Sequence, residues 1–362
     1  MASCSLIASI LNPPALTDNF LSCLAGLREQ EEFELVLVND GDSNIETGRA
    51  IEAYRSVLHP RVLRHDASLG YGRANNAGAE AARRDILVFL NTDVFPNPGA
   101  ITSLIDVLAS DPSIGVAQGL LLYPQSGRVQ SCGHIFGPYF NRHALVGRSA
   151  ALPIVQQAAD RQALTSAFYA VRRDDFVRFG GFDETYLNSH EGMEFALRLH
   201  LDGLRCRYHP DSRAFHVQGG SRRHVPMNED QQLALFWSRW HDKVERDLDD
   251  LLAGQISQEQ RRYRYLGINF STNLFWKDTW AALGLSVDVV AEPVLRGHSV
   301  ILHDTLTAEI RRSNRPLLFL TDHFSNVSGN LMWFSERPVR TDLILDCHGN
   351  VVTVGEVLGS SP

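Results

Sequence analysis

One acidic residue stands at the end of a short apolar run. Residues 86–90 read Ile-Leu-Val-Phe-Leu, and Asn91-Thr92-Asp93 follows at once. Such a run is typical of a buried parallel strand, and open α/β sheets place ligand chemistry at the carboxyl ends of their strands. Asp93 is therefore a candidate for holding a metal ion or a phosphate group. Asn, Thr and Asp also favour ordinary turns, and the tripeptide alone does not separate the two interpretations.

Two other segments carry groups suited to a nucleotide. Residues 36–43 read Val-Leu-Val-Asn-Asp-Gly-Asp-Ser, so that amide and carboxylate oxygens follow an apolar run and can accept hydrogen bonds from a base or ribose. Residues 68–78 read Ser-Leu-Gly-Tyr-Gly-Arg-Ala-Asn-Asn-Ala-Gly, a Gly-rich start to a helix whose amides can face an anion. The spacing is neither GxGxxG nor a P-loop, which disfavours a dinucleotide or Walker-type site. Taken alone, the segment at 36–43 fits an ordinary turn better than a nucleotide site.

A fourth segment lies between residues 180 and 216. Gly-Gly-Phe-Asp-Glu at 180–184 precedes His190, Glu191 and Glu194, and His216 ends a later stretch. Glu191 and Glu194 are three residues apart and can share one face of a helix N-terminus, where negative charge is favourable. Helix capping would explain this pair if the segment stood alone.

The elements that must position these residues alternate along the first half of the chain. Apolar runs of strand character alternate with helical patterns; the runs are 5–11, 33–38, 62–65, 86–90 and 115–122, and the helices 18–28, 45–57, 73–84 and 100–109. This alternation is typical of βαβ units, with a mostly parallel sheet covered by helices on both faces. Gly and Pro interrupt residues 123–162, which we expect to be a loop and irregular extension. A strand at 167–172 and helices near 174–179 and 193–202 should follow.

The C-terminal third differs in composition. A polar stretch at 255–264 precedes β-like runs at 287–290, 300–303, 316–320 and 343–345, and residues 347–350 suggest a turn between two strands. We therefore expect one large domain over 1–250 and a small, separate module over 251–362.

Composition excludes some classes of protein. The chain has 362 residues, 44% of them hydrophobic, and a formal net charge of −8, which argues against a general nucleic-acid binder. Its five cysteines are scattered without metal-ligand spacing, which favours a reducing compartment. No apolar segment is long enough for a membrane span. We expect a cytoplasmic protein, with peripheral membrane association and homo-oligomerisation left open.

Together and in this order, the four segments resemble the inverting family 2 glycosyltransferases of the GT-A fold, especially the bacterial rhamnosyltransferase-like members. The resemblance covers roughly residues 5–245 and includes an intact Gly-Gly-Phe-Asp-Glu turn. It implies an α/β fold with a Rossmann-like mixed sheet and flanking helices. The module at 251–362 lies outside it and would serve acceptor binding, oligomerisation or partner docking.

The resemblance also implies a nucleotide-sugar site at the strand ends and the Gly-rich helix start, formed by Asn39, Asp40, Gly70, Arg73, Asn76 and Thr92. Residues 91–93 resemble the family's DxD motif with only the last acid kept, which implies that Asp93 binds Mg²⁺ or Mn²⁺ through the donor diphosphate. His216 resembles a late histidine that completes this site. Arg222, beside Arg223 and His224, could clamp the diphosphate in a closing loop or form a solvated basic turn.

One departure from the family concerns the general base. The family's Glu-Asp pair at the start of the later helix reads Glu191-Gly192 here, so the usual Asp base is absent. Glu191 is the nearest substitute because of its longer side chain. Glu194 is the second candidate, although it also suits pairing with Arg198, and His190 is the third because histidine titrates near neutral pH.

The resemblance implies the transfer of a sugar, with inversion, from a nucleotide sugar to a saccharide or lipid-linked saccharide in cell-surface glycan synthesis. A divalent cation would neutralise the leaving diphosphate, and a base would deprotonate the acceptor hydroxyl. The alternative is a catalytically silent GT-A domain that binds a nucleotide or glycan as a scaffold, which Gly192 and the reduced DxD motif favour. A Rossmann oxidoreductase is disfavoured by the absent GxGxxG.

Overall fold

The chain divides into two compact units. The computed structural model describes residues 3–11, 13–217, 229–271, 276–291, 313–327 and 342–357. The first unit comprises Met1–His134 and Val146–Val244, and the second comprises Ile135–Leu145 and Glu245–Pro362. The boundary expected at residue 250 falls within helix α9 (Leu248–Ala253) of the second unit. The roles predicted for the two parts stay predictions.

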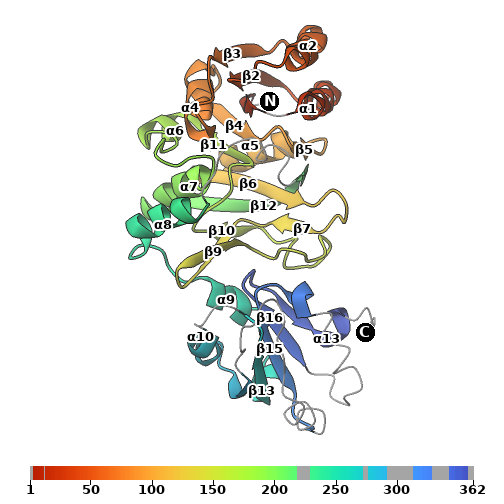
Figure 1. Cartoon of the computed structure of the whole chain (residues 1–362), viewed down its shortest axis with the longest axis vertical. Helices are drawn as coiled ribbons and strands as arrows, with labels where there is room; N and C mark the ends of the chain where they lie inside the picture. The colour runs from red at the N-terminus through yellow and green to blue at the C-terminus, as the bar shows by residue number, and fades with distance from the viewer. Residues whose placement is uncertain are drawn as a thin grey trace. The chain divides into compact units, whose positions relative to one another are not determined.

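A mixed sheet forms the centre of the first unit (Figure 1). In the described part of the chain its strand order is β10-β12-β6-β11-β4-β1-β2-β3, with β5 paired to β12 and β7 paired to β6. The strands are β1 (Cys4–Ile10), β2 (Phe33–Asp40), β3 (Arg61–His65), β4 (Ile86–Leu90), β5 (Val94–Pro96), β6 (Ile114–Leu122), β7 (Val129–Ser131), β10 (Ala159–Arg161), β11 (Phe168–Arg172) and β12 (Arg205–His216). Because β3, β2, β1 and β4 are parallel neighbours, their carboxyl ends share one edge of the sheet.

Helices cover both faces of this sheet. They are α1 (Pro14–Leu27), α2 (Ile45–Ala53), α3 (Arg55–Leu58), α4 (Tyr71–Ala81), α5 (Ala100–Ser110), α6 (Arg173–Arg178), α7 (Glu191–Leu201) and α8 (Glu229–Trp240). Alternate residues of β1, such as Leu6 and Ala8, join one core cluster with side chains of α1, α2 and α5. Their neighbour Ile7 points to the other face and meets α4, where a Cβ on Gly78 would lie 2.5 Å from Ile7 Cγ2. Because successive side chains of a strand point to opposite faces of the sheet, alternate residues of β1 pack on helices of opposite faces.

Strand β12 carries a sequence-predicted site residue, His216, at its end. It runs parallel to β6, with a register shift between His209 and Arg213. We did not predict a strand over this stretch from the sequence, because its buried positions include Pro210 and Ser212, which are untypical of a strand interior.

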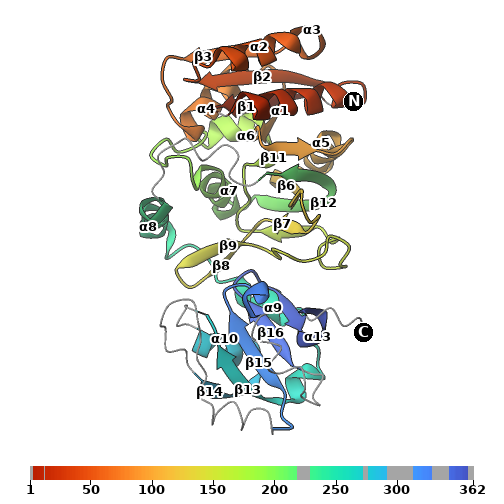
Figure 2. The same ribbon diagram turned by 45° about the vertical axis from the view of Figure 1, so that its right-hand side comes forward.

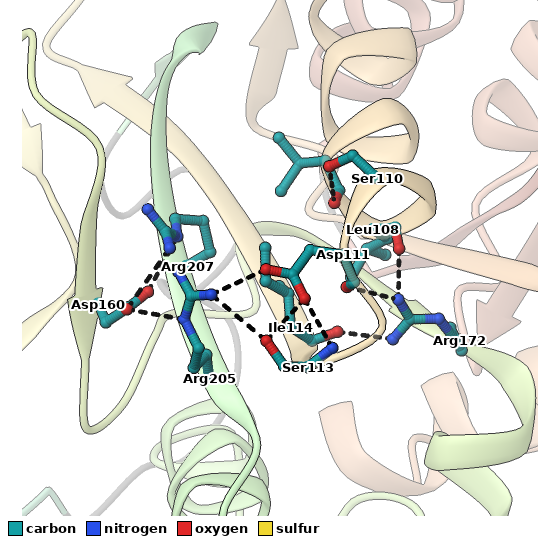
Figure 3. A network of polar contacts seen from close by, with 10 residues as sticks. Leu108, Ser110, Asp111, Ser113, Ile114, Asp160, Arg172, Arg205 and Arg207 are labelled. Atoms are coloured by element: carbon teal, nitrogen blue, oxygen red, sulfur yellow. Dashed lines mark hydrogen bonds and ion pairs between the residues drawn. The ribbon is translucent and has the colours of Figure 1, made fainter.

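An arginine network fastens the opposite end of β12 (Figure 3). Arg205 Nη1 lies 2.8 Å from Asp111 Oδ2, and Arg205 Nε lies 2.9 Å from Asp160 Oδ2. Arg172 donates to the carbonyls of Leu108 and Asp111, near the end of α5. These contacts satisfy carbonyls that a helix C-terminus leaves open, and they join β6, β10, β11 and β12.

The second unit contains a smaller sheet in the order β14-β13-β15-β16-β17 (Figure 2). Its elements are α9, the 3₁₀ helix η2 (Gln260–Arg262), β13 (Arg264–Asn269), α10 (Trp276–Ala282), β14 (Ser286–Ala291), β15 (Leu317–Thr321), η3 (Phe324–Val327), β16 (Leu343–Asp346), β17 (Val351–Thr353) and α13 (Val354–Val357). Four of these strands are parallel, and β17 is antiparallel to β16. A separate hairpin pairs β8 (His134–Gly137) with β9 (Phe140–His143).

The structure confirms the predicted α/β class and most of the elements of the first half. The prediction of a wholly irregular segment over 123–162 was wrong, because β7, β8, β9 and β10 lie there. These strands have only three or four residues, too few for a period of two to show in the sequence. The strand predicted at 300–303 lies outside the described residues. No helix in the described ranges combines the length and hydrophobicity needed to cross a membrane.

Candidate active site

Asp40, at the end of β2, anchors the Gly-rich loop before α4. Its carboxylate accepts hydrogen bonds from the Ser68 hydroxyl at 2.7 Å and from the amides of Leu69 and Gly70, each at 3.0 Å. His65 Nδ1 lies 2.7 Å from the same carboxylate. Because a carboxylate accepts about four hydrogen bonds, these contacts engage both oxygens of a residue that is 3% exposed. Asp40 therefore shapes the loop, and its binding of the nucleotide base stays a prediction.

Asn39 closes a local turn. Its Nδ2 donates to the Asp42 carbonyl at 2.9 Å, and its Oδ1 accepts from the Asp42 amide at 2.8 Å. The turn lies so close to the next loop that a Cβ on Gly41 would be 2.4 Å from the backbone nitrogen of Ser68. The turn interpretation of this segment fits the structure, and recognition of a nucleotide base by Asn39 stays a prediction.

The start of α4 contacts the segment that leads to α7. Gly70 has a φ of +90°, a left-handed conformation that favours glycine. The Tyr71 amide donates to Asn188 Oδ1 at 2.8 Å, and the Tyr71 hydroxyl donates to the Ser166 carbonyl at 3.1 Å. Two of the predicted segments, the Gly-rich loop and the region after residue 180, are therefore brought together.

Asn76 and Arg73 both contact the Gly-Gly-Phe-Asp-Glu turn, and their binding of the donor stays a prediction. Asn76 Nδ2 donates to the Phe182 carbonyl, and Asn76 Oδ1 accepts from the Phe182 amide, each at 2.9 Å. Arg73 Nε lies 3.1 Å from Glu184 Oε2 on the surface. The paired bonds of Asn76 fix the turn against α4, whereas the exposed ion pair of Arg73 adds little.

Phe182 of this turn packs within an aromatic cluster. Its ring centroid lies 4.8 Å from that of Phe89, 5.2 Å from Phe176 and 5.7 Å from both Phe195 and Tyr71. These side chains come from β4, α6, α7 and α4. The cluster therefore fixes the turn relative to the strand that leads to Asp93.

Glu194 supports the same turn through Arg198. Glu194 Oε1 lies 2.9 Å from Arg198 Nε, while the other guanidinium nitrogens donate to the carbonyls of Phe179 and Gly181. Burial raises the pKa of Glu194, and the guanidinium of Arg198 offsets only part of this rise. A carboxylate engaged by a turn-fixing arginine is better suited to positioning than to accepting a proton from a substrate.

Glu191 is the first residue of α7 and is 3% exposed. A Cβ on Gly72 would lie 3.5 Å from Glu191 Cγ, so this side chain lies against the first turn of α4. The next residue, Gly192, has no space for a side chain, because its Cβ would lie 2.1 Å from Ser166 Oγ and 2.2 Å from Ser166 Cβ. Ser166 therefore fills the volume that an Asp at position 192 would need.

Ser166 joins three of the predicted segments, although no sequence pattern identified it. The carbonyl of the following residue, Ala167, accepts from the Asn91 amide at 2.9 Å, which ties the strand β11 to the end of β4. The Ser166 carbonyl binds Tyr71, and the Ser166 side chain packs on Gly192. The ends of β4, α4 and α7 thus meet around one small loop. Its role follows from close approach, which neither residue type nor spacing reveals.

His190 precedes α7 with a φ of +74°. Its Nδ1 lies 2.7 Å from Ser189 Oγ, and its ring lies 6.3 Å from Tyr186 and 5.8 Å from Phe236 of α8. The ring is packed between aromatic groups, which suits a positioning role more than proton transfer.

Asp183 connects the turn to α8. Its carboxylate accepts from the Thr185 amide at 2.8 Å and lies 2.7 Å from Arg239 Nη1 of α8. Burial acts to raise the pKa of Asp183, but the hydrogen bonds from Thr185 and the charge of Arg239 outweigh it, so the pKa lies below the ordinary value. Asp183 is therefore an ion-pairing carboxylate at neutral pH.

Asp93 and His216 lie side by side. Strands β5 and β12 are antiparallel neighbours that pair Val94 with His216, and the Val217 amide donates to the Asp93 carbonyl at 2.9 Å. His216 Nε2 is 3.3 Å from Asp93 Oδ1, and the Asp93 side chain is 1% exposed. The sequence placed these residues in one site although they are 123 positions apart, and the structure brings them together.

Two other predicted positions, Thr92 and Arg222, have different outcomes. Thr92 is buried between Asn91 and Asp93. Asn91 Oδ1 is also buried, and within the described ranges it has no hydrogen-bond partner. Arg222 lies outside the described residues. In the same described part of the chain, no group of three or more His, Cys, Asp or Glu side chains has metal-binding geometry, so Asp93 and His216 form a two-residue pair.

The fold and the sequence together define the family of this part of the chain. Residues 11–151 match the model of the family described as "Glycosyl transferase family 2". This part of the chain thus belongs to the family 2 glycosyltransferases, and the first unit has the GT-A fold.

Similar proteins agree with this assignment. The O-antigen biosynthesis protein RfbC of Myxococcus xanthus is 28% identical over 231 residues, which cover 60% of this chain and 18% of that protein. N-acetylglucosaminyl-diphospho-decaprenol L-rhamnosyltransferase of Mycobacterium tuberculosis is 25% identical over 238 residues, which cover 60% of this chain and 76% of that enzyme. The structure of GalNAc-T7 with UDP, GalNAc and Mn²⁺ aligns with a TM-score of 0.50 and 13% identity over 79% of this chain and 55% of GalNAc-T7, and supports the fold alone.

Proposed function

We propose that the chain is an inverting glycosyltransferase that uses Mg²⁺ or Mn²⁺ in cell-surface glycan synthesis. It would transfer a sugar from a nucleotide-sugar donor to a saccharide or lipid-linked saccharide hydroxyl in the cytoplasm. The observation that carries the proposal is the pair of Asp93 Oδ1 and His216 Nε2, 3.3 Å apart at the sheet edge where ligand sites of α/β proteins form. The O-antigen and rhamnosyltransferase functions of the two relatives support the same class of product.

The side chains of this pair fit a divalent cation. A carboxylate oxygen and an imidazole nitrogen are common ligands of divalent metals. Asp93 directly precedes β5, and His216 ends the neighbouring strand β12. Asn91 Oδ1 adds a buried oxygen for which the described residues supply no donor. Two protein ligands leave the remaining positions of the cation to diphosphate oxygens and water, as is usual for metal sites that bind nucleotides.

The reaction then follows from the roles of individual groups. A bound cation supplies positive charge that stabilises the departing diphosphate. Asp93 and His216 would hold that charge at the end of β4, and the positive N-terminal end of α4 would add to it. The acceptor oxygen forms a bond to the anomeric carbon as the bond from that carbon to the diphosphate oxygen breaks. Attack from the opposite face inverts the anomeric centre.

Glu191 is the proposed general base. It would take the proton that the acceptor hydroxyl loses, because among the three candidates Glu194 is engaged by Arg198 and His190 is packed between aromatic rings. Glu191 starts α7 beside the first turn of α4. The positive ends of both helices would stabilise its ionised form.

One observation favours the scaffold alternative. Ser166 fills the space beside Gly192, so no acid can replace the family's base at this position without a further change. If Glu191 does not reach the acceptor, the chain would bind a nucleotide or glycan without turnover.

Turnover with a panel of nucleotide sugars separates the two functions. The full chain is incubated with each donor, Mn²⁺ and a mixture of saccharide acceptors, and the release of nucleoside diphosphate is measured. Acceptor-dependent release supports the transferase, whereas binding of UDP, TDP or GDP without release across the panel supports the scaffold. Asp93→Ala should abolish metal-dependent donor binding, and Asp106→Ala on the exposed face of α5 is the matched control. Unchanged donor affinity of Asp93→Ala in Mn²⁺ would contradict the metal site.

A further inference from the structure

Gln130 is a buried polar residue next to the proposed metal pair. It lies in the middle of β7, is 5% exposed, and comes 86 positions before His216 in the chain. β7 pairs with the end of β6, so Gln130 is held by a strand on the side of the site that neither Asp93 nor β5 supplies. No motif in the sequence marks this residue.

The Gln130 amide makes two contacts with His216. Its Nε2 donates to the His216 carbonyl at 3.3 Å, and its Oε1 lies 2.6 Å from His216 Nδ1. The amide nitrogen of Gln130 therefore donates to a backbone carbonyl, and the amide oxygen faces the imidazole ring of His216. Because this oxygen is only an acceptor, the ring nitrogen facing it must carry the hydrogen.

The tautomer of His216 follows from this contact. With the hydrogen on Nδ1, the neutral ring has its lone pair on Nε2, the atom 3.3 Å from Asp93 Oδ1. A lone pair and a carboxylate oxygen then face one another, an arrangement that is stable when a cation lies within reach of both. Without Gln130, the ring could place its hydrogen on Nε2 and donate it to Asp93, which would remove the nitrogen as a ligand.

We propose that Gln130 is a positioning residue that fixes the orientation and tautomer of His216, so that Nε2 binds the divalent cation. The proposal rests on the metal site of the proposed function. Gln130 touches neither the cation nor the donor and acts only through His216. Residues that bind the second nitrogen of a metal-ligating histidine commonly change metal affinity by about 10- to 100-fold.

Metal titrations of the full chain test the proposal without requiring turnover. Co²⁺ and Mg²⁺ are titrated in the presence of the nucleoside diphosphate that binds most tightly, for wild type, Gln130→Met, Gln130→Glu, His216→Gln and the double variant Gln130→Met/His216→Gln. Co²⁺ is the probe because it binds imidazole nitrogen well and its absorption spectrum reports the ligand, whereas Mg²⁺ prefers oxygen. Thermal melting without metal shows whether each variant is folded.

We expect Gln130→Met to weaken Co²⁺ binding by about 10- to 100-fold and Mg²⁺ binding less. Gln130→Glu keeps an acceptor for the Nδ1 hydrogen and should bind Co²⁺ at least as tightly as wild type. This second variant tests the proposal even if Gln130→Met folds poorly. In the His216→Gln background, Gln130→Met should have no further effect.

Other results overturn the inference. Equal Co²⁺ affinity in wild type and a folded Gln130→Met, an equal loss for both metals, or a Gln130→Glu variant that binds as weakly as His216→Gln would each show that Gln130 has only a structural role. Failure of wild type itself to bind either metal with any nucleoside diphosphate is a different outcome, because it would refute the metal site of the proposed function.

Discussion

A methyl group at position 192 should destabilise the first unit, and removal of the Ser166 side chain should relieve the effect. An added Cβ would lie 2.1 Å from Ser166 Oγ, 2.2 Å from Ser166 Cβ and 2.8 Å from the Ser166 backbone nitrogen. Contacts this short cannot persist, so α7 or residue 166 has to move. Residue 166 is held in place, because its carbonyl binds the Tyr71 hydroxyl and the next carbonyl binds the Asn91 amide.

The size of the effect follows from two opposing contributions. Overpacking a filled site costs about 1–3 kcal/mol, whereas replacing Gly by Ala in a helix contributes up to about 1 kcal/mol of stability. We expect Gly192→Ala to lower the free energy of unfolding of the first unit by about 1–2 kcal/mol. In a Ser166→Gly background two of the three close contacts are gone and only the one to the backbone nitrogen of residue 166 remains, so the same substitution should destabilise much less. The coupling between the two positions should then be about 1–3 kcal/mol.

Hydrogen exchange of the α7 amides at increasing urea concentration measures this effect locally, and therefore does not require the two units to unfold together. Gly48→Ala is the matched control, because it lies in α2 and its Cβ would meet no heavy atom within 4 Å. It should stabilise its own helix by about 0.5–1 kcal/mol. If Gly192→Ala behaves like Gly48→Ala and shows no coupling to Ser166→Gly, then the close packing of α7 on this loop is incorrect.

Three other substitutions test the roles assigned to the site. Glu191→Gln should lower kcat by about 10²- to 10⁴-fold with little change in donor affinity, which steady-state kinetics and donor titration measure. Turnover of this variant at the wild-type rate would mean that Glu194 or His190 is the base. Asn76→Ala should destabilise the first unit by about 1–3 kcal/mol in urea unfolding, whereas Arg73→Ala, which removes an exposed ion pair, should change stability by less than about 1 kcal/mol; equal effects would refute the turn-fixing role. Because the pKa of Asp183 is lowered in the folded chain, the native state binds fewer protons than the unfolded state just below pH 3.8, and stability present above that pH is lost as the pH falls through the folded pKa. The decrease in melting temperature between pH 6 and pH 3 should be smaller for Asp183→Asn than for wild type, and an identical decrease would contradict the ion pair with Arg239.

The sequence predicted the first half of the fold because its strands and helices are long and regular. β4 is apolar throughout and buried, and α5 has a continuous apolar face. Prediction failed where tertiary contacts replace local pattern. β12 has Pro210 and Ser212 among its buried positions, and β7 has three residues whose pairing with β6 supplies the stability that so short a strand lacks alone. Such strands are stabilised by pairing with neighbouring strands, and a single sequence does not show which segments lie side by side.

The candidate site was predictable to a different extent. The strand end predicted Asp93, the family resemblance added His216, and the structure places the two residues in contact. Ser166 and Gln130 were not predicted, because a serine in a loop and a glutamine in a short strand carry no pattern of their own. Their importance arises from what they touch, Gly192 in one case and His216 in the other.

Binding a ligand and anchoring a loop require the same chemical groups, which is why residue type alone separates them poorly. Asp40 and Asn76 have carboxylate and amide oxygens suited to a nucleotide, yet the described contacts of these oxygens go to the protein's own loops. Asp93 and His216 differ because a carboxylate oxygen and a ring nitrogen face each other, an arrangement that would suit the proposed cation. The anchors matter for this pair indirectly: the Gly-rich loop, the aromatic turn and the Ser166 loop fix the strand ends and helix starts around it, and a donor can meet all of these groups at once only if they stay fixed.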